Sequence, residues 1–174
     1  MKIALIVIAA VVGVAILVAF VGWSLPVKHR AARQAFLSAT PESVYAVISA
    51  PRDFPSWRSK VKSVEMLPES EHHTSYRETG DDGTIAYVVD EAIPARRLVT
   101  RIADPSLPFG GTWTYELVPT ASGTTVRITE DGEVYNIVFR FMSRFVFGHH
   151  ATIDGYLRDL GRHFKQDVTI TSVS

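Results

Sequence analysis

The chain has 174 residues, 47% of them hydrophobic, and its 18 basic residues are balanced by 18 acidic ones. This length accommodates one ordinary domain and an additional segment. A balanced charge provides no positive field to recruit nucleic acid. The sequence contains no cysteine, which excludes a disulfide framework, thiolate catalysis and cysteine-based zinc sites.

The additional segment is the N-terminus. Residues 3–23 carry no charge, and at about 1.5 Å per residue such a helix crosses a hydrocarbon core of roughly 30 Å. We therefore expect residues 1–24 to form a single transmembrane anchor. A cleaved signal peptide is the alternative, with Gly22-Trp23-Ser24 as a weak small-x-small site, although the apolar core of signal peptides usually spans about 7 to 15 residues.

Residues 25–31 are expected to link the anchor to a globular domain at residues 32–168. When fully extended, the connection from Ser24 to Ala31 reaches at most about 28 Å, so the domain should lie close to the bilayer. Basic residues follow the span, whereas only Lys2 precedes it. The positive-inside tendency then predicts a cytoplasmic domain. The basic residues in question are Lys28, Arg30 and Arg33.

The domain begins with weak alternation at residues 32–39, which predicts a strand. The period then changes to that of a short helix. Thr40 is a suitable N-cap, Pro41 suits the first helical position, and Glu42 complements the helix dipole. Residues 52–59 are expected to add a second brief helical turn.

Six further segments show strand-like character. Tight connections at residues 80–83 and 120–123 indicate that neighbours in sequence pair in antiparallel fashion. Together with residues 32–39, these segments predict a seven-stranded antiparallel sheet. They are residues 61–67, 72–79, 84–92, 96–103, 112–118 and 124–135.

Residues 137–165 are predicted to form one amphipathic helix of about eight turns. Its apolar stripe requires a cover of similar length, so an α+β fold with this helix laid across the sheet is expected. Residues 169–174 remain as a C-terminal tail. The stripe consists of Val138, Met142, Phe145, His149, Ile153, Tyr156 and Leu160.

This order of elements resembles the START-like (SRPBCC) superfamily, in particular its polyketide cyclase/dehydrase and lipid-transport group with the helix-grip (Bet v 1/START-like) fold. The resemblance covers about residues 33–165 and rests on residues 39–45, 54–57 and 111–117 and on the closing helix. It implies a cavity between sheet and helix, which relatives use for sterols, lipids and polyketides. It supplies no shared catalytic set to transfer.

Several aromatic side chains are predicted on the faces that enclose this cavity, where they would serve equally well as pocket lining or as ordinary core. Two polar residues are predicted on the same faces. Each would act in acid/base chemistry or ligand hydrogen bonding if it points inward. The alternatives are a satisfied core histidine and a solvated strand end. The candidate ligand-binding residues are Trp57, Tyr87, Trp113, Tyr115, Glu130, Met142, Phe145, His149 and Tyr156.

No metal or cofactor is expected. His72 and His73 are adjacent in a strand and point to opposite faces, while His149 and His150 lie about 100° apart on a helix. The glycines at residues 110–111 lack the spacing and the following helix of a phosphate-binding loop.

Three functions remain open at this level. The first is a membrane-tethered module that binds or transfers a small hydrophobic ligand or lipid. The second is an enzyme of the cyclase or dehydratase type, and the third is an accessory module that binds another protein and keeps a vestigial cavity. A co-purified lipid would favour the first function, and a well-packed interior with no cavity above roughly 300 Å³ would favour the third.

The connection at Leu107-Pro108-Phe109 is unusually apolar for a surface loop. In the helix-grip arrangement it should lie near the start of the long helix, beside Ile137 and Phe139. We hypothesise that these residues form a rim that touches the membrane. The alternative is that the loop folds inward and closes the cavity.

Overall fold

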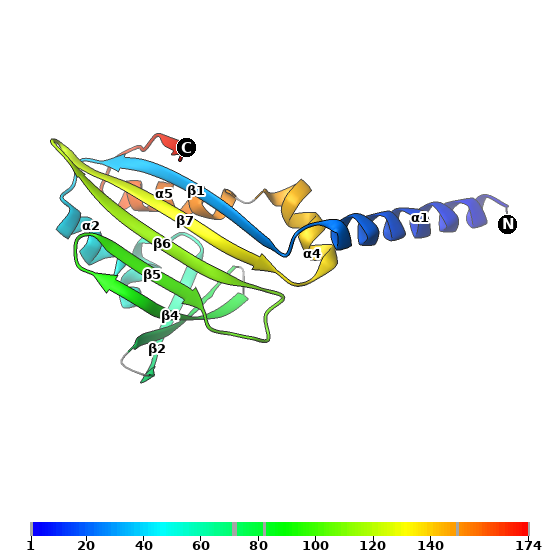
Figure 1. The fold of residues 1–174 in the computed structure, drawn as a ribbon, viewed down its shortest axis with the longest axis horizontal. Coiled ribbons are helices and arrows are strands. Elements are labelled where there is room, and N and C mark those ends of the chain that lie inside the picture. The colour runs from blue at the N-terminus through cyan, green and yellow to red at the C-terminus, as the bar shows by residue number, and fades with distance from the viewer. Residues whose placement is uncertain (1, 71–72, 82, 149, 174) are drawn as a thin grey trace.

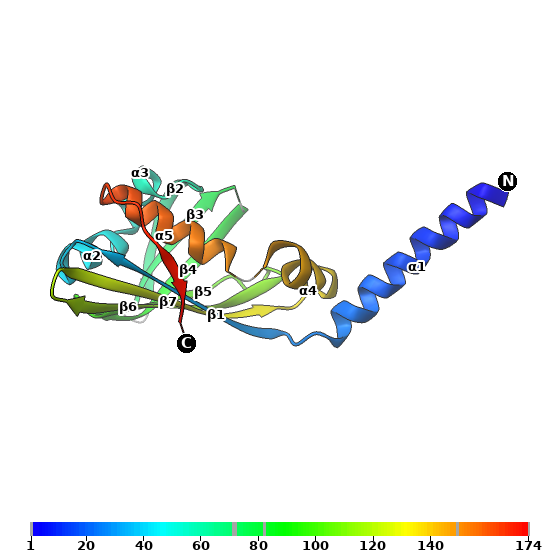
Figure 2. The same cartoon turned by 90° about the horizontal axis from the view of Figure 1, so that it is seen from above.

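A computed structural model describes residues 2–70, 73–81, 83–148 and 150–173. One curved antiparallel sheet wraps around a C-terminal helix, and an N-terminal helix projects away from it (Figures 1 and 2). Within the described residues the sheet has eight strands in the order β2-β3-β4-β5-β6-β7-β1-β8. The α+β helix-grip architecture is therefore confirmed, with one strand more than predicted.

The seven expected strands are present, and the additional one is formed by the predicted C-terminal tail. The tail becomes a strand because it pairs with the free edge of β1, at Arg33↔Ser172 and Ala35↔Ile170. The strands are β1 (Lys28–Leu37), β2 (Val61–Ser70), β3 (His73–Gly80), β4 (Gly83–Ile93), β5 (Arg97–Ile102), β6 (Phe109–Thr120), β7 (Gly123–Val134) and β8 (Ile170–Ser172).

Strand β1 also corrects the expected linker at residues 25–31. It begins at Lys28 and pairs with β7 from Lys28↔Glu133 to Leu37↔Thr124. The ladder satisfies backbone groups that a free linker would leave to water. Only residues 25–27 separate the N-terminal helix from the sheet.

The short helices follow the local sequence signals. In α2 (Pro41–Ile48), the Thr40 side chain accepts a hydrogen bond from the Ser43 amide, so the predicted N-cap is confirmed. The turns η1 (Pro51–Asp53) and α3 (Phe54–Trp57) follow. They place Phe54 and Trp57 in the core.

The predicted continuous helix at residues 137–165 is wrong. The chain forms α4 (Ile137–Met142), a π-helical turn η2 (Ser143–Phe147) and a separate helix α5 (Ala151–His163). Gly148 has φ 72° and ψ 154°, a conformation that glycine adopts readily and that ends the helix. The stripe is divided accordingly, because Ile153 is fully buried whereas Phe145 is 59% exposed.

Helix α5 lies across the concave face of the sheet (Figure 2). Leu157 and Leu160 are almost fully buried there. The Asp159 carboxylate fixes the helix to the start of β2, since it accepts hydrogen bonds from the Ser59 amide at 2.8 Å and from the Ser59 hydroxyl at 2.9 Å. This contact holds α5 over the sheet next to α3.

Helix α1 (Lys2–Ser24) is long and apolar enough to cross a membrane, a property that it shares with signal sequences. Its C-terminal end packs against α4 and does not enter the core (Figure 1).

Candidate functional site

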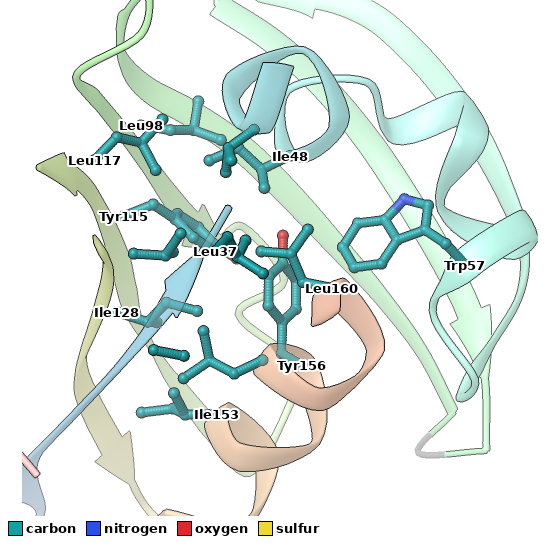
Figure 3. Packing of buried hydrophobic residues seen from close by; sticks show 14 of the residues in the cluster. Leu37, Ile48, Trp57, Leu98, Tyr115, Leu117, Ile128, Ile153, Tyr156 and Leu160 are labelled. Atoms are coloured by element: carbon teal, nitrogen blue, oxygen red, sulfur yellow. The ribbon is translucent and has the colours of Figure 1, made fainter. Parts of the chain in front are cut away.

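An aromatic cluster fills the space between α5 and the sheet. Tyr156 is surrounded by Trp57, Trp113 and Tyr115, with ring centroids 5.2, 5.9 and 5.4 Å away. Figure 3 shows Tyr156 rising from α5 between Trp57 and Tyr115. These four predicted residues therefore meet, and they do so as a packed cluster at the centre of the domain.

A buried ion pair beside this cluster was missed by the sequence analysis. Arg58 pairs with Glu78, and their side chains are only 20% and 9% exposed. The Arg58 guanidinium also lies 5.0 Å from the Phe54 ring centre and 5.2 Å from that of Tyr156. The inward alternation of Glu78 with Tyr76 along β3 was the available signal.

Burial raises the pKa of the Glu78 carboxyl, and Arg58 opposes this rise. Burial likewise raises the pKa of Tyr115 to about 12. Burial also raises the pKa of Tyr156 well above its ordinary value, and the neighbouring Tyr115 adds to that rise. Both phenols therefore stay protonated at neutral pH. They suit hydrogen bonding to a neutral group better than service as a base.

A pocket of about 250 Å³ lies beside the cluster, between α2 and strands β3, β4 and β5. None of its lining residues is charged, and half of them carry a hydroxyl group. Ala92 is exposed and so marks the opening. The lining residues are Tyr45, Ile48, Ser49, Pro51, Thr74, Tyr76, Val89, Ala92, Leu98 and Thr100.

Among the eight predicted site residues that the structure describes, none lines this pocket, but Tyr87 contacts a residue of the lining. Its ring stacks on Tyr76 with centroids 5.4 Å apart, and Tyr76 is part of the lining. Tyr76 also contacts Phe54, with ring centroids 5.9 Å apart, and Phe54 contacts Trp57 of the cluster at 5.7 Å. The pocket and the aromatic cluster are thus continuous through Tyr76.

The remaining predicted residues lie elsewhere. The Glu130 carboxylate is 3.7 Å from His29 Nε2. Met142 is half-buried in α4, and Phe145 is exposed beside Phe141, with ring centroids 5.0 Å apart. His149 lies outside the described residues.

A second hollow of about 530 Å³ is lined by residues of β1, β6, β7 and β8 and by His150. Its lining includes charged side chains, and both of its arginines have counter-charges. Arg30 lies 3.6 Å from Asp131, and Arg127 lies 4.0 Å from Glu116. It does not suit an apolar ligand. Among the described residues, no group of three His, Asp or Glu side chains is arranged to hold a metal ion.

Solved structures show that the chain has a START-like fold. A START superfamily protein from Mycobacterium smegmatis matches with TM-score 0.63 and 15% identity, over 79% of this chain and 97% of that one. A conserved protein from Geobacillus kaustophilus matches with TM-score 0.65 and 16% identity, over 82% and 99%. The di-domain ARO/CYC StfQ from the steffimycin biosynthetic pathway matches with TM-score 0.61 and 17% identity, over 80% and 51%.

The particular family follows from the sequence. Residues 28–165 match the family model described as polyketide cyclase / dehydrase and lipid transport, and the chain belongs to that family. The curated proteins contain no match. At these identities the structural neighbours establish the fold alone.

Proposed function

We propose that the protein is a membrane-held module that binds a small, neutral, largely apolar ligand in the pocket beneath α2. The observation that carries the proposal is the uncharged lining of that pocket, with five apolar and five hydroxyl-bearing residues. Ligand sites combine an apolar wall with a few polar groups that fix orientation. A charged ligand would find no counter-ion there and would lose its hydration.

The volume limits the size of the ligand. An engineered apolar cavity of about 150 Å³ binds benzene, whereas drug-sized ligands occupy about 300–1,000 Å³. At about 250 Å³, the pocket suits a molecule of one or a few rings, or one short chain. A complete membrane lipid would have to leave most of its length outside.

The second candidate function is an accessory module that binds another protein and keeps a vestigial cavity. Trp57, Trp113 and Tyr115 pack around Tyr156 at the centre of the domain, and the pocket is smaller than the roughly 300 Å³ below which a well-packed interior favours this function. Enzymatic activity has less support, because the lining contains no carboxylate, imidazole or amine. The most acidic groups of the lining are the phenols of Tyr45 and Tyr76, and burial raises the pKa of both, so neither suits the role of a general base at neutral pH.

Membrane attachment is part of the proposal. The most apolar 18-residue window of helix α1 has a mean hydropathy of 3.2 and contains no buried residue, as expected of a helix surrounded by lipid. The basic residues after it support a cytoplasmic location of the domain. A ligand that partitions into the bilayer would then be concentrated beside the pocket.

The test uses the full-length protein in lipid nanodiscs and the neutral fluorophore 1-aminoanthracene. Ala92→Trp places an indole at the pocket opening and should abolish saturable fluorescence enhancement. Ala86→Trp is the matched control, since Ala86 lies on the same strand, paired with Arg77, on the opposite face from Val89. Saturable binding that survives Ala92→Trp, or no binding by the wild type, would refute the proposal.

A further inference from the structure

The segment from Ile137 to Val146 exposes an unusual amount of apolar surface for part of a folded domain. Its exposed apolar side chains stand in two groups, residues 137–139 at the start of α4 and residues 145–146 in η2, which together we call the apolar patch. Surface helices of globular proteins normally place polar residues on such a face. The exposed fractions are 38% for Ile137, 49% for Val138, 38% for Phe139, 59% for Phe145 and 57% for Val146.

The same segment is fastened to the end of α1. A Cβ atom at Gly22 would lie only 2.1 Å from the Ile137 carbonyl oxygen, so the two backbones meet where only glycine fits. Arg140 adds a second connection, because its guanidinium donates hydrogen bonds to the carbonyls of Leu25 at 2.8 Å and Val134 at 3.1 Å. The last turn of α1 is thus joined to α4.

The break at Gly148 makes this arrangement possible. If the helix continued through Gly148, residues 137–147 would extend the axis of α5 along the sheet. The Asn136 side chain caps α4 by accepting hydrogen bonds from Val138 and Phe139 amides, both at 3.0 Å. On the domain side, Phe139 stacks on Phe109 at 6.0 Å. The segment is therefore an ordered structural unit of its own.

We propose that residues 137–147 form an interfacial segment, which lies in the boundary between headgroups and acyl chains of the leaflet where α1 ends. This proposal rests on the membrane attachment proposed above and adds a second contact between the protein and the bilayer, besides α1. Trp23, 70% exposed, belongs to the residue types that gather at this depth. Because Gly22 contacts Ile137, α4 begins at the same level.

The occupant of the patch is lipid because the patch continues the lipid-facing surface of α1. Apolar interfacial helices bury one face about 5–10 Å deep and keep cationic groups near the phosphates. Arg144 is exposed within the segment and can serve as that cation. Two contacts, a span and an interfacial segment, hold the domain in one orientation, whereas a flexible linker would let it rotate.

Labelling tests the proposal directly, since the cysteine-free chain needs only one added thiol per variant. The full-length protein carries the polarity-sensitive fluorophore NBD at Val146→Cys, in nanodiscs whose phosphatidylcholine has brominated acyl chains. We expect emission at shorter wavelength and a loss of intensity through bromine quenching. Arg158→Cys, exposed on α5, should show neither change.

A third label separates the two proposals. Val14→Cys lies within α1, where the side chain is 61% exposed. Quenching at residue 14 without quenching at residue 146 would refute the interfacial segment alone. Absence of quenching at residue 14 would refute membrane attachment itself.

A pair of glycine variants tests the fastening to α1. Gly22→Leu would drive a side chain into the Ile137 carbonyl, whereas Gly13 has no neighbouring atom within 4 Å of a Cβ position. Gly22→Leu should therefore reduce quenching at residue 146, and Gly13→Leu should leave it unchanged. Equal quenching in both variants would contradict a role for α1 in placing the segment.

Discussion

The buried Arg58–Glu78 pair offers the sharpest test of how the interior is held together. Replacing Arg58 with Met keeps a long side chain between Phe54 and Tyr156 but leaves the Glu78 carboxylate buried without its counter-charge. Removing one partner of a buried pair typically costs about 3–5 kcal/mol. At about 2–4 °C per kcal/mol for a domain of this size, Tm should fall by about 6–20 °C.

The matched control is Arg77→Met, at the residue that precedes Glu78 on β3. Arg77 pairs with Glu65 at 2.7 Å, but these side chains are 43% and 65% exposed. Exposed pairs of this kind contribute about 0–1 kcal/mol. Thermal and urea unfolding of the full-length protein, followed by tryptophan fluorescence, should therefore separate the two variants clearly.

The pH dependence of the Arg58→Met variant gives an independent check. The pKa of Glu78 is raised in the folded protein, so its contribution to stability is fully present below the unfolded value of about 4.5 and is lost as pH rises through the raised pKa. Loss of Arg58 raises this pKa further, because Arg58 lowers it in the wild type. The penalty should be smaller near about pH 4 than near about pH 7.5.

The double variant completes a double-mutant cycle for the Arg58–Glu78 pair. Arg58→Met with Glu78→Met removes both charges and should recover much of the lost stability, since no unpaired charge remains buried. If Arg58→Met costs less than about 1 kcal/mol, or if its penalty does not change with pH, the pair is not buried as described.

Three further outcomes are expected. Serine at both Leu107 and Phe109 should weaken liposome binding of the anchor-free domain at unchanged stability if the loop is a membrane rim. Phe109 stacks on Phe139, so a lower Tm with unchanged liposome binding would instead mean that the loop only closes the cavity. Deletion of residues 1–27 should give a soluble domain that circular dichroism shows to be folded, and an insoluble or unfolded fragment would make the segment part of the fold. Thr40→Ala should lower the free energy of unfolding by about 1 kcal/mol in urea through loss of the α2 cap, and no change would mean that the cap is not stabilising.

Local signals predicted the local structure well. The N-cap at Thr40 and the strands between tight turns depend on residues close in sequence, and both are confirmed. The break at Gly148 was not predicted, because a glycine permits such a break but contacts outside the segment decide whether the helix ends there. Residues 137–147 can pack either on the sheet or on α1. Periodicity does not indicate which of these two apolar surfaces the stripe will cover.

In the candidate site, too, features set by local sequence were predicted and features set by distant contacts were not. The periodicity of the strands and the helix correctly predicted that Trp113, Tyr115 and Tyr156 all point into the domain interior, since periodicity indicates which face a side chain occupies. It does not report the volume left between those faces. The pocket is built by α2 together with segments of three strands, and Arg58 and Glu78 were overlooked because charged residues are usually exposed.

The most direct test of the central claim is to ask what the protein carries. Full-length wild type and the Ala92→Trp variant would be purified in the same nanodiscs, extracted with organic solvent and compared by mass spectrometry. A small neutral molecule should be recovered in about equimolar amount from the wild type and be depleted from Ala92→Trp. Recovery of only bulk lipid, or of the same molecules from both proteins, would contradict a ligand-binding pocket beneath α2.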